Sequence, residues 1–182
     1  MILVLVAIDR ELEGVTLPFG YKVIEIGVGK INATGSTVQA ILRHNPKKII
    51  NYGTAGSLNK KLTRGLYRVS KVYQRDMDCR PFGIELGVTP YDHVAEIDMG
   101  IEGVTLGTGD SFVTSIPELV TDLVDMEGYA VAKAADRWNI PCEIYKFVSD
   151  FANADAIKEW GTNVSNGATL FSDLLGKKRK TN

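Results

Sequence analysis

The chain opens on the run Ile2-Leu3-Val4-Leu5-Val6-Ala7-Ile8, which is followed at once by Asp9, Arg10 and Glu11. An unbroken apolar run of this length, rich in leucine and β-branched residues, is typical of a strand that is covered on both faces. The run is too short to cross a membrane as a helix, and it lacks the basic flank and small-residue cleavage site of a signal peptide. We therefore expect a buried first strand and a protein that stays in the cytoplasm.

Strand-like and helix-like segments alternate along the rest of the chain. Strands are expected over residues 22–27, 48–52, 66–73, 103–106 and 142–148, and helices over residues 30–44, 117–123, 127–138 and 154–175. Pro117 is well suited to the first turn of the second helix. The alternation predicts one α/β domain over residues 1–182, a three-layer α/β/α sandwich around a central mixed sheet. Residues 79–98 show little periodicity and are expected to form a long, functional loop.

The composition argues against several classes of function. The 182 residues carry a formal net charge of −1, so no general basic field is available to hold nucleic acid or an anionic membrane. The basic run Lys177-Lys178-Arg179-Lys180 is expected to be a solvated tail. Cys79, Cys142, His44 and His93 stand at no metal-ligand spacing. We expect two free thiols, no metal site and no other cofactor.

The segment Gly27-Val28-Gly29-Lys30 raises the question of a phosphate-binding loop. It does not fit the P-loop, because Ile24 stands where the first glycine belongs and Ile31 replaces the serine or threonine after the lysine. It does not fit the dinucleotide fingerprint either, because Asn32 stands at the third glycine position. Two interpretations are left: a tight turn from strand to helix, or a helix N-terminus that faces a ligand.

Polar side chains follow four of the expected strands. They are Glu11, Thr54, the segment Asp110-Ser111-Phe112 and the pair Ser149-Asp150, and Glu127 adds a carboxylate at the start of a helix. Each has an ordinary structural explanation as a turn cap, a helix-dipole partner or a surface charge. In open α/β sheets, however, ligands bind outside the carboxyl ends of the strands. Together these residues would place several carboxylates and an aromatic ring around one crevice.

Six segments in this order resemble the methylthioadenosine/S-adenosylhomocysteine nucleosidases of the purine nucleoside phosphorylase superfamily, over nearly the whole chain. They are Ala7-Ile8-Asp9-Arg10-Glu11, Gly27-Val28-Gly29-Lys30, Gly53-Thr54-Ala55-Gly56, Gly109-Asp110-Ser111-Phe112-Val113, Asp125-Met126-Glu127-Gly128 and Ser149-Asp150. The resemblance implies a nucleoside phosphorylase-like fold and a homodimer. It also implies hydrolysis of the N-glycosidic bond of adenine nucleosides, as in methionine salvage, with a small-molecule nucleoside as the substrate and neither nucleic acid nor a membrane as a partner.

The resemblance also assigns roles to single residues. Glu11 matches the glutamate that holds and activates the attacking water. Met126 and Glu127 match the pair beside the ribose, whose carboxylate takes the sugar hydroxyls. Asp150 matches the acid that serves purine N7 and the exocyclic amine. These three carboxylates, Glu11, Glu127 and Asp150, are the expected catalytic groups.

The remaining roles concern substrate binding. Phe112 matches the ring that stacks on the base, and Val113 matches the residue whose backbone reads the adenine edge. Ser149 belongs to the Ser-Asp pair beside the base. Thr54 and Lys146 match polar neighbours of the water, although the family typically has serine and arginine there. Those two roles are therefore the least direct matches.

The reaction explains why acids are needed at separate points. Cleavage of an N-glycosidic bond builds positive charge on the ribose and negative charge on the departing purine. A positioned acid that protonates the leaving base typically contributes about 10²–10⁴-fold. One further carboxylate stabilises the oxocarbenium-like state, and another orients water on the far face of the sugar.

The sequence is short for the family, and the missing material falls between Asp76 and Gly103, which leaves the 5′ substituent of the substrate undetermined.

Three interpretations of the activity stay open: hydrolysis, phosphorolysis and nucleoside binding without catalysis. Phosphorylases carry a glycine-rich, arginine-bearing phosphate loop after the first strand. Residues 7–11 replace that loop here, but Arg10 and Arg43 keep phosphorolysis as an alternative. A catalytically silent nucleoside-binding module is the third interpretation, against which the three carboxylates argue.

Overall fold

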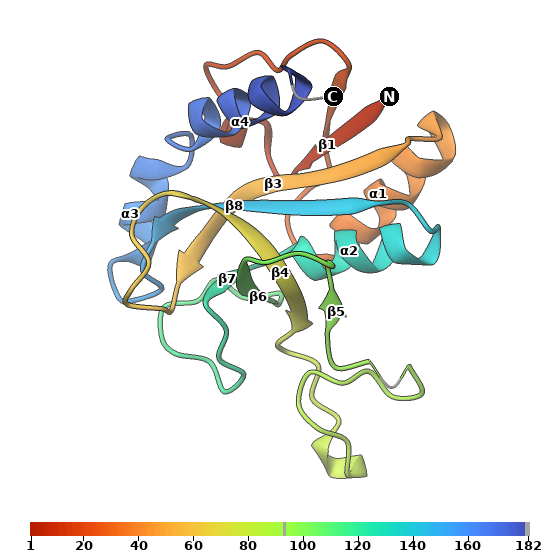
Figure 1. Ribbon diagram of the computed structural model, residues 1–182. Coiled ribbons are helices and arrows are strands. Elements are labelled where there is room, and N and C mark those ends of the chain that lie inside the picture. Colours follow the sequence, from red (N-terminus) through yellow and green to blue (C-terminus); the bar gives the residue numbers. More distant parts are fainter. Residues whose placement is uncertain (93, 181–182) are drawn as a thin grey trace.

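The computed structural model describes residues 1–92 and 94–180, which build one mixed sheet with helices on both faces (Figure 1). The strands are β1 (Ile2–Val6), β2 (Tyr21–Glu25), β3 (Lys48–Ser57), β4 (Leu66–Gln74), β5 (Ile97–Asp98), β6 (Val104–Thr108), β7 (Leu123–Asp125) and β8 (Cys142–Asp150). The helices are α1 (Lys30–His44), α2 (Gly128–Arg137), α3 (Ala156–Asn163) and α4 (Ala168–Lys180), with short 3₁₀ turns η1 (Asp9–Leu12) and η2 (Arg80–Phe82). The predicted α/β/α sandwich around a mixed sheet is confirmed.

Part of the sheet is closed into a ring of strands. Its strand order is β2-β1-β3-β7-β6-β4-β5, and β8 pairs with both β3 and β4. The pairings β3–β8, β8–β4, β4–β6, β6–β7 and β7–β3 therefore form a ring of five strands. Within this ring, every strand has neighbours on both sides, so its backbone groups are paired without an open edge.

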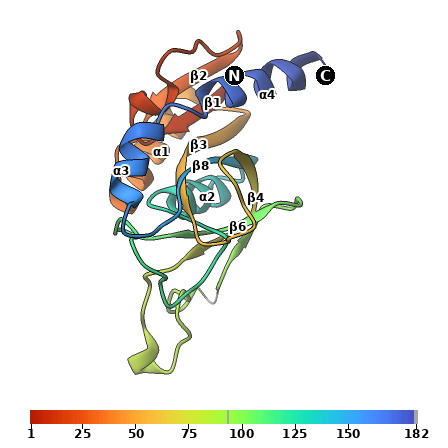
Figure 2. The same ribbon diagram turned by 90° about the vertical axis from the view of Figure 1, so that its left-hand side faces the viewer.

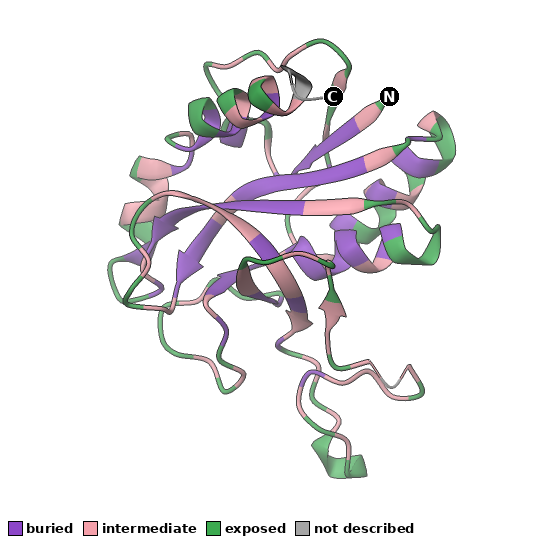
Figure 3. Ribbon diagram, viewed as in Figure 1, coloured by how far each residue is buried: buried purple, intermediate pink, exposed green. Residues whose placement is uncertain are grey.

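Strand β1 is covered on both faces, as its apolar run predicts. Leu3 and Leu5 pack in one cluster with side chains of α1 and α2, whereas Val4 and Val6 pack in another with side chains of α4. Successive side chains of a strand point to opposite faces, so one unbroken apolar run serves both layers. Figure 3 shows the resulting band of buried residues along β1, β3 and β8.

The predicted helix over residues 117–123 is wrong. Residues 114–122 are irregular, and Leu123–Asp125 is the short strand β7, which pairs with β3 and with β6. Asp122 fixes the segment that leads into β7, because its carboxylate accepts hydrogen bonds from the N–H and hydroxyl of Thr105 at 2.9 and 2.8 Å. Hydrogen bonds to β3 and β6 pair the backbone N–H and C=O groups of β7 on both sides. A short helix over these residues would leave several of these groups without a partner.

The predicted closing helix over residues 154–175 is two helices, α3 and α4, separated at residues 164–167. The break directs α4 onto the face that carries Tyr52, whose ring stacks on Phe171 with a centroid distance of 4.2 Å. Other segments differ at their ends. β3 runs five residues further than predicted, so Thr54 lies within the strand and not after it; β4, β6 and β8 each run one or two residues further, and β2 ends two residues earlier. The long loop contains η2 and ends at β5, and residues 77–92 extend away from the sheet (Figures 1 and 2).

No helix within the described ranges, 1–92 and 94–180, is both long and apolar enough to cross a membrane. Of the four α-helices in these ranges, α1 is the longest, with 15 residues. The basic run at residues 177–180 continues α4 rather than forming the solvated tail that was expected; of its side chains, Lys178 pairs with Glu143 at 2.6 Å.

Gly167→Ala should destabilise the fold, because a Cβ at this position would lie 2.4 Å from Cγ of Phe147 and 2.7 Å from the Tyr52 hydroxyl. Overpacking of this kind typically costs about 1–3 kcal/mol. Gly176→Ala is the matched control, since its Cβ would meet nothing within 4 Å and alanine favours a helix by about 1 kcal/mol. Urea unfolding of both variants measures the difference, and equal stabilities would contradict the packing described here.

Candidate active site

The carboxyl ends of β1, β3 and β8 meet at one edge of the sheet, because β3 pairs in parallel with both of the other strands. A pocket of about 370 Å³ opens at this edge. Eight of the nine side chains predicted for the site line it: Glu11, Thr54, Phe112, Val113, Met126, Glu127, Ser149 and Asp150. The structure therefore brings together residues that are far apart in the sequence, since 139 positions separate Glu11 from Asp150.

Glu11 lies in η1, directly after β1, and only 4% of it is exposed. Its Oε1 accepts hydrogen bonds from the N–H and hydroxyl of Thr54 at 2.7 and 3.1 Å, and its Oε2 accepts one from the N–H of Ala7 at 3.0 Å. Burial raises the pKa of Glu11, against the charge of Lys146 and these hydrogen bonds, which favour the ionised form. Gly53 leaves the necessary space, since a Cβ there would lie 2.9 Å from Oε1.

Lys146, the ninth predicted residue, lies on β8 and is buried beside the pocket rather than in its lining. Its Nζ is 2.8 Å from Oδ2 of Asp125, and the same carboxylate accepts a hydrogen bond from Gly128 N–H at 2.8 Å. Burial alone would lower the pKa of Lys146, but the charges of Asp125, Glu127 and Glu11 raise it above its usual value. The ammonium group therefore stays charged among three acids.

Glu127 precedes α2, and its Oε1 accepts a hydrogen bond from the N–H of Gly29 at 2.9 Å. Burial, followed by the charge of Asp125, raises its pKa from the ordinary 4.5 to about 7, although Lys146 acts in the opposite direction. Ionisation of Glu127 therefore falls in the neutral range, and its charge is sensitive to whatever lies in the pocket.

Asp150 ends β8 and is also buried. Its Oδ1 accepts a hydrogen bond from the N–H of Ala152 at 3.0 Å, and its Oδ2 accepts one from the hydroxyl of Ser149 at 2.9 Å. Burial raises the pKa of Asp150, despite these two hydrogen bonds. Ala152 has φ 47°, a left-handed conformation that carries the chain sharply away after the strand. A buried carboxyl with a raised pKa is suited to hold and donate a proton.

Two aromatic side chains also line the pocket. Phe112 is 42% exposed, and its ring meets the indole of Trp160 edge-on, with centroids 6.4 Å apart and planes at 77°. The loop before Phe112 is held by Arg75, whose guanidinium donates to the carbonyls of Ser111 and Gly109 at 2.6 and 3.2 Å. The ring thus lines the pocket on a loop that is held in place by hydrogen bonds.

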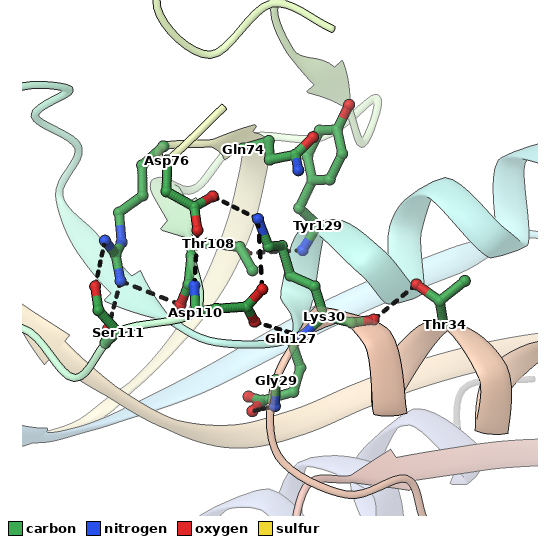
Figure 4. A network of polar contacts seen from close by, with 12 residues as sticks. Gly29, Lys30, Thr34, Gln74, Asp76, Thr108, Asp110, Ser111, Glu127 and Tyr129 are labelled. Atoms are coloured by element: carbon green, nitrogen blue, oxygen red, sulfur yellow. Dashed lines mark hydrogen bonds and ion pairs between the residues drawn. The ribbon is translucent and has the colours of Figure 1, made fainter. Parts of the chain in front are cut away.

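The segment Gly27-Val28-Gly29-Lys30 forms a tight turn into α1, with Gly27 and Gly29 at positive φ. The N–H groups at the start of the helix bind carboxylates of this chain: Gly29 donates to Glu127, and Lys30 donates to Oδ1 of Asp110 at 2.7 Å. The Lys30 ammonium also pairs with Asp76 at 2.5 Å (Figure 4). The turn interpretation therefore holds, and side chains of the protein itself occupy this helix N-terminus.

Sequence reasoning assigns no role to two residues of the site. Asp125 belongs to one of the six segments that carry the resemblance, but the helix expected over residues 117–123 hides the strand β7 that Asp125 ends. Trp160 lies in α3 and lines the pocket, where its Nε1 donates to the Thr54 hydroxyl at 3.0 Å. Its only signal in the sequence was an indole within a helical pattern, which does not distinguish a pocket wall from the core.

The two arginines that kept phosphorolysis as an alternative lie outside the pocket lining. Arg10 is exposed and donates to the carbonyl of Gly161 at 3.1 Å. Arg43 is exposed in the last turn of α1. The charged side chains that line the pocket are four acids: Glu11, Asp125, Glu127 and Asp150. Among the residues that the structure describes, no group of three or more histidines, cysteines or acids is arranged to hold a metal ion.

The fold and this acid-lined pocket define the class of protein. The chain matches the Phosphorylase superfamily over residues 20–176. It is also similar to two solved structures from Helicobacter pylori over its whole length. These are a futalosine hydrolase mutant, with 22% identity, 99% coverage and a TM-score of 0.87, and a 5′-methylthioadenosine/S-adenosylhomocysteine nucleosidase with butyl-thio-DADMe-Immucillin-A, with 23%, 98% and 0.86.

Closer sequence relatives specify the family. A 5′-methylthioadenosine/S-adenosylhomocysteine nucleosidase of Staphylococcus haemolyticus is 32% identical over 155 residues, covering 71% of this chain and 68% of that protein. The corresponding protein of Staphylococcus saprophyticus is 31% identical over 182 residues, covering 85% and 79%. The chain therefore belongs to the methylthioadenosine/S-adenosylhomocysteine nucleosidase family of the phosphorylase superfamily.

Glu127→Gln should make the fold more stable than wild type at pH 8, and the difference should vanish towards pH 4.5. Because the pKa of Glu127 is raised in the folded state, the folded protein holds this proton more tightly than the unfolded chain does. Stability is thus lost as the pH rises from about 4.5 through about 7, and glutamine avoids this loss. Its amide oxygen can still accept from Gly29.

The comparison requires a carboxylate without this burial. Glu13→Gln is the matched control, since Glu13 is exposed just beyond η1. Thermal unfolding at a series of pH values measures all three proteins. A Glu127→Gln advantage of the same size at pH 4.5 and pH 8 would contradict the linkage to ionisation.

Proposed function

We propose that this protein hydrolyses the N-glycosidic bond of adenine nucleosides, such as 5′-methylthioadenosine or S-adenosylhomocysteine, to free base and a ribose derivative. The observation that carries the proposal is the placement of three buried carboxylates, Glu11, Glu127 and Asp150, at separate points of one pocket. Its relatives in two Staphylococcus species are named as nucleosidases for these substrates.

Asp150 is the proposed acid for the leaving base. Its raised pKa favours a protonated carboxyl, and the Ser149 hydroxyl and Ala152 N–H fix its two oxygens. A proton passed to purine N7 lets the base leave as a neutral molecule. Phe112, which lines the pocket and is 42% exposed, is proposed to stack on the purine, while the Val113 backbone reads the adenine edge.

Glu11 and Glu127 are the proposed groups on the sugar side. Glu11 already receives three hydrogen bonds, so a water molecule bound to a remaining lone pair would be oriented for attack. Glu127 and Met126 lie beside each other in the lining, where the carboxylate would accept the ribose hydroxyls. Its negative charge would also stabilise the positive charge that develops on the ribose.

The charges of the pocket favour water over phosphate as the nucleophile. The four ionisable side chains of the lining are all acids, none is an arginine or lysine that could pair with phosphate, and Arg10 and Arg43 lie outside the lining. A purely binding module remains the other alternative. It would not need a water-holding carboxylate and a base-protonating acid together in one pocket, where the burial of each acid costs stability.

Purified protein should release adenine from 5′-methylthioadenosine in phosphate-free buffer, and added phosphate should not increase the rate. Asp150→Asn should lower kcat by about 10²–10⁴-fold, because the amide cannot protonate the leaving base. Asp155→Asn is the matched control, since this exposed carboxylate lies five residues further along the chain. Chromatography of the released base measures each rate.

The alternatives give different results in the same assay. Base release that depends on phosphate would establish phosphorolysis. Binding of the nucleoside without release of base under either condition would establish a binding module. A panel of methylthio, homocysteinyl, deoxy and hydroxyl nucleosides then identifies the preferred 5′ substituent.

The proposed enzyme is a homodimer of the cytoplasm. The resemblance to the family supports the proposal of a dimer, and so do several apolar side chains that are more than 80% exposed in the single chain: Phe19, Ile31, Phe82 and Tyr91. The free thiols of Cys79 and Cys142 fit a reducing compartment. Sedimentation at micromolar concentration should give the mass of two chains, and a monomer under these conditions would contradict the proposal.

A further inference from the structure

Trp160 and Glu11 are joined through one hydroxyl group. The indole Nε1 of Trp160 donates to Oγ1 of Thr54 at 3.0 Å, and the same oxygen lies 3.1 Å from Oε1 of Glu11. The N–H of Thr54 also donates to this carboxylate oxygen, at 2.7 Å. The three side chains come from α3, β3 and η1, so the hydrogen bonds connect the helix α3 with the turn that follows β1.

The chemistry of the three groups fixes the direction of each hydrogen bond. An indole N–H can only donate, so the Thr54 oxygen must accept from Trp160. The single proton of the hydroxyl is then free to point at Glu11, which accepts it when ionised. Without the indole, the hydroxyl could rotate and offer its oxygen to Glu11 or its proton elsewhere. A fixed donor to the carboxylate therefore depends on Trp160.

We propose that Trp160 is a positioning residue for hydrolysis: its indole N–H holds the Thr54 hydroxyl as a donor to Glu11, which fixes the carboxylate that orients the attacking water. The inference rests on the function proposed above. Oε1 of Glu11 receives both bonds from Thr54, and Oε2 receives the bond from Ala7, so few lone pairs are left. Water bound there has a restricted set of orientations.

Trp160 also contacts both the proposed position of the base and, through Thr54, the proposed position of the attacking water. Its ring meets Phe112 at the proposed base position, while its N–H reaches the proposed water position through Thr54. Both contacts come from a side chain that lines the pocket. A role as pocket wall alone would need the ring but not the N–H, and this difference separates the two explanations.

The decisive variant is Trp160→Phe, which keeps an aromatic ring and removes the N–H. We expect kcat to fall about 3–10-fold, the range of one neutral hydrogen bond, with KM for 5′-methylthioadenosine nearly unchanged. Trp138→Phe is the matched control and should leave both constants unchanged, because Trp138 ends α2 and lies outside the pocket lining. A raised KM with unchanged kcat in Trp160→Phe would overturn the proposal.

A double-mutant cycle tests the route through Thr54. Thr54→Val removes the hydroxyl, so adding Trp160→Phe to it should cause no further loss of kcat. Thr54→Ser keeps a hydroxyl and should lose much less than Thr54→Val. Effects of Thr54→Val and Trp160→Phe that multiply in full would show two independent roles and would overturn the coupling.

The hydrogen bond can also be measured without turnover, which separates this inference from the proposed reaction. The chain has two tryptophans, so ¹⁵N-labelled protein gives two indole N–H signals, and Trp160→Phe assigns them. Exchange of the Trp160 N–H with solvent should accelerate in Thr54→Val, whereas that of Trp138 should not change. An unchanged rate for Trp160 would refute the contact, whatever the protein is found to hydrolyse.

Discussion

The ammonium of Lys146 balances three acids in a region from which water is largely excluded. It contacts Asp125 at 2.8 Å, and the charges of Glu127 and Glu11 act on it as well. Burial of a carboxylate without an opposite charge is costly, so Lys146 allows the acids to be placed together beside the pocket. The placement of η1, of the end of β7 and of the start of α2 depends on this ammonium group of β8, because each of the three contributes one of these acids.

The single ammonium group does not fully compensate the negative charge of these acids, and the site can use the charge that is left. Burial raises the pKa of Glu11, Asp150 and Glu127, the last to about 7. Such groups cost stability at neutral pH and gain it back only where a ligand supplies positive charge or hydrogen-bond donors. An oxocarbenium-like ribose supplies positive charge to an ionised carboxylate, whereas purine N7 accepts the proton of a protonated one. These acids therefore interact more strongly with the charges that develop in the transition state than with the uncharged ground state.

Substrate-facing groups are held by hydrogen bonds that come from several distant elements. The Phe112 loop is held by Arg75 from beyond β4, Glu127 is held by the turn before α1, and Glu11 is held by Thr54 of β3. None of these supports is local in the sequence. Rigid placement from several elements is what a reaction with charge at two ends of the substrate requires, because small displacements of an acid or a water are costly.

The sequence by itself determined the alternation of strands and helices, the burial of β1 and most of the pocket, because apolar runs and polar residues at strand ends are local patterns. The tertiary structure alone decided the rest. Residues 123–125 became a strand because β3 and β6 lie on both sides of them, and Trp160 became part of the site because α3 folds back over Thr54. Lys146 was recognised as a site residue, but its partner Asp125 depended on the same unpredicted strand. Pairings between distant segments leave no periodic trace in either partner, and for that reason only the folded chain reveals them.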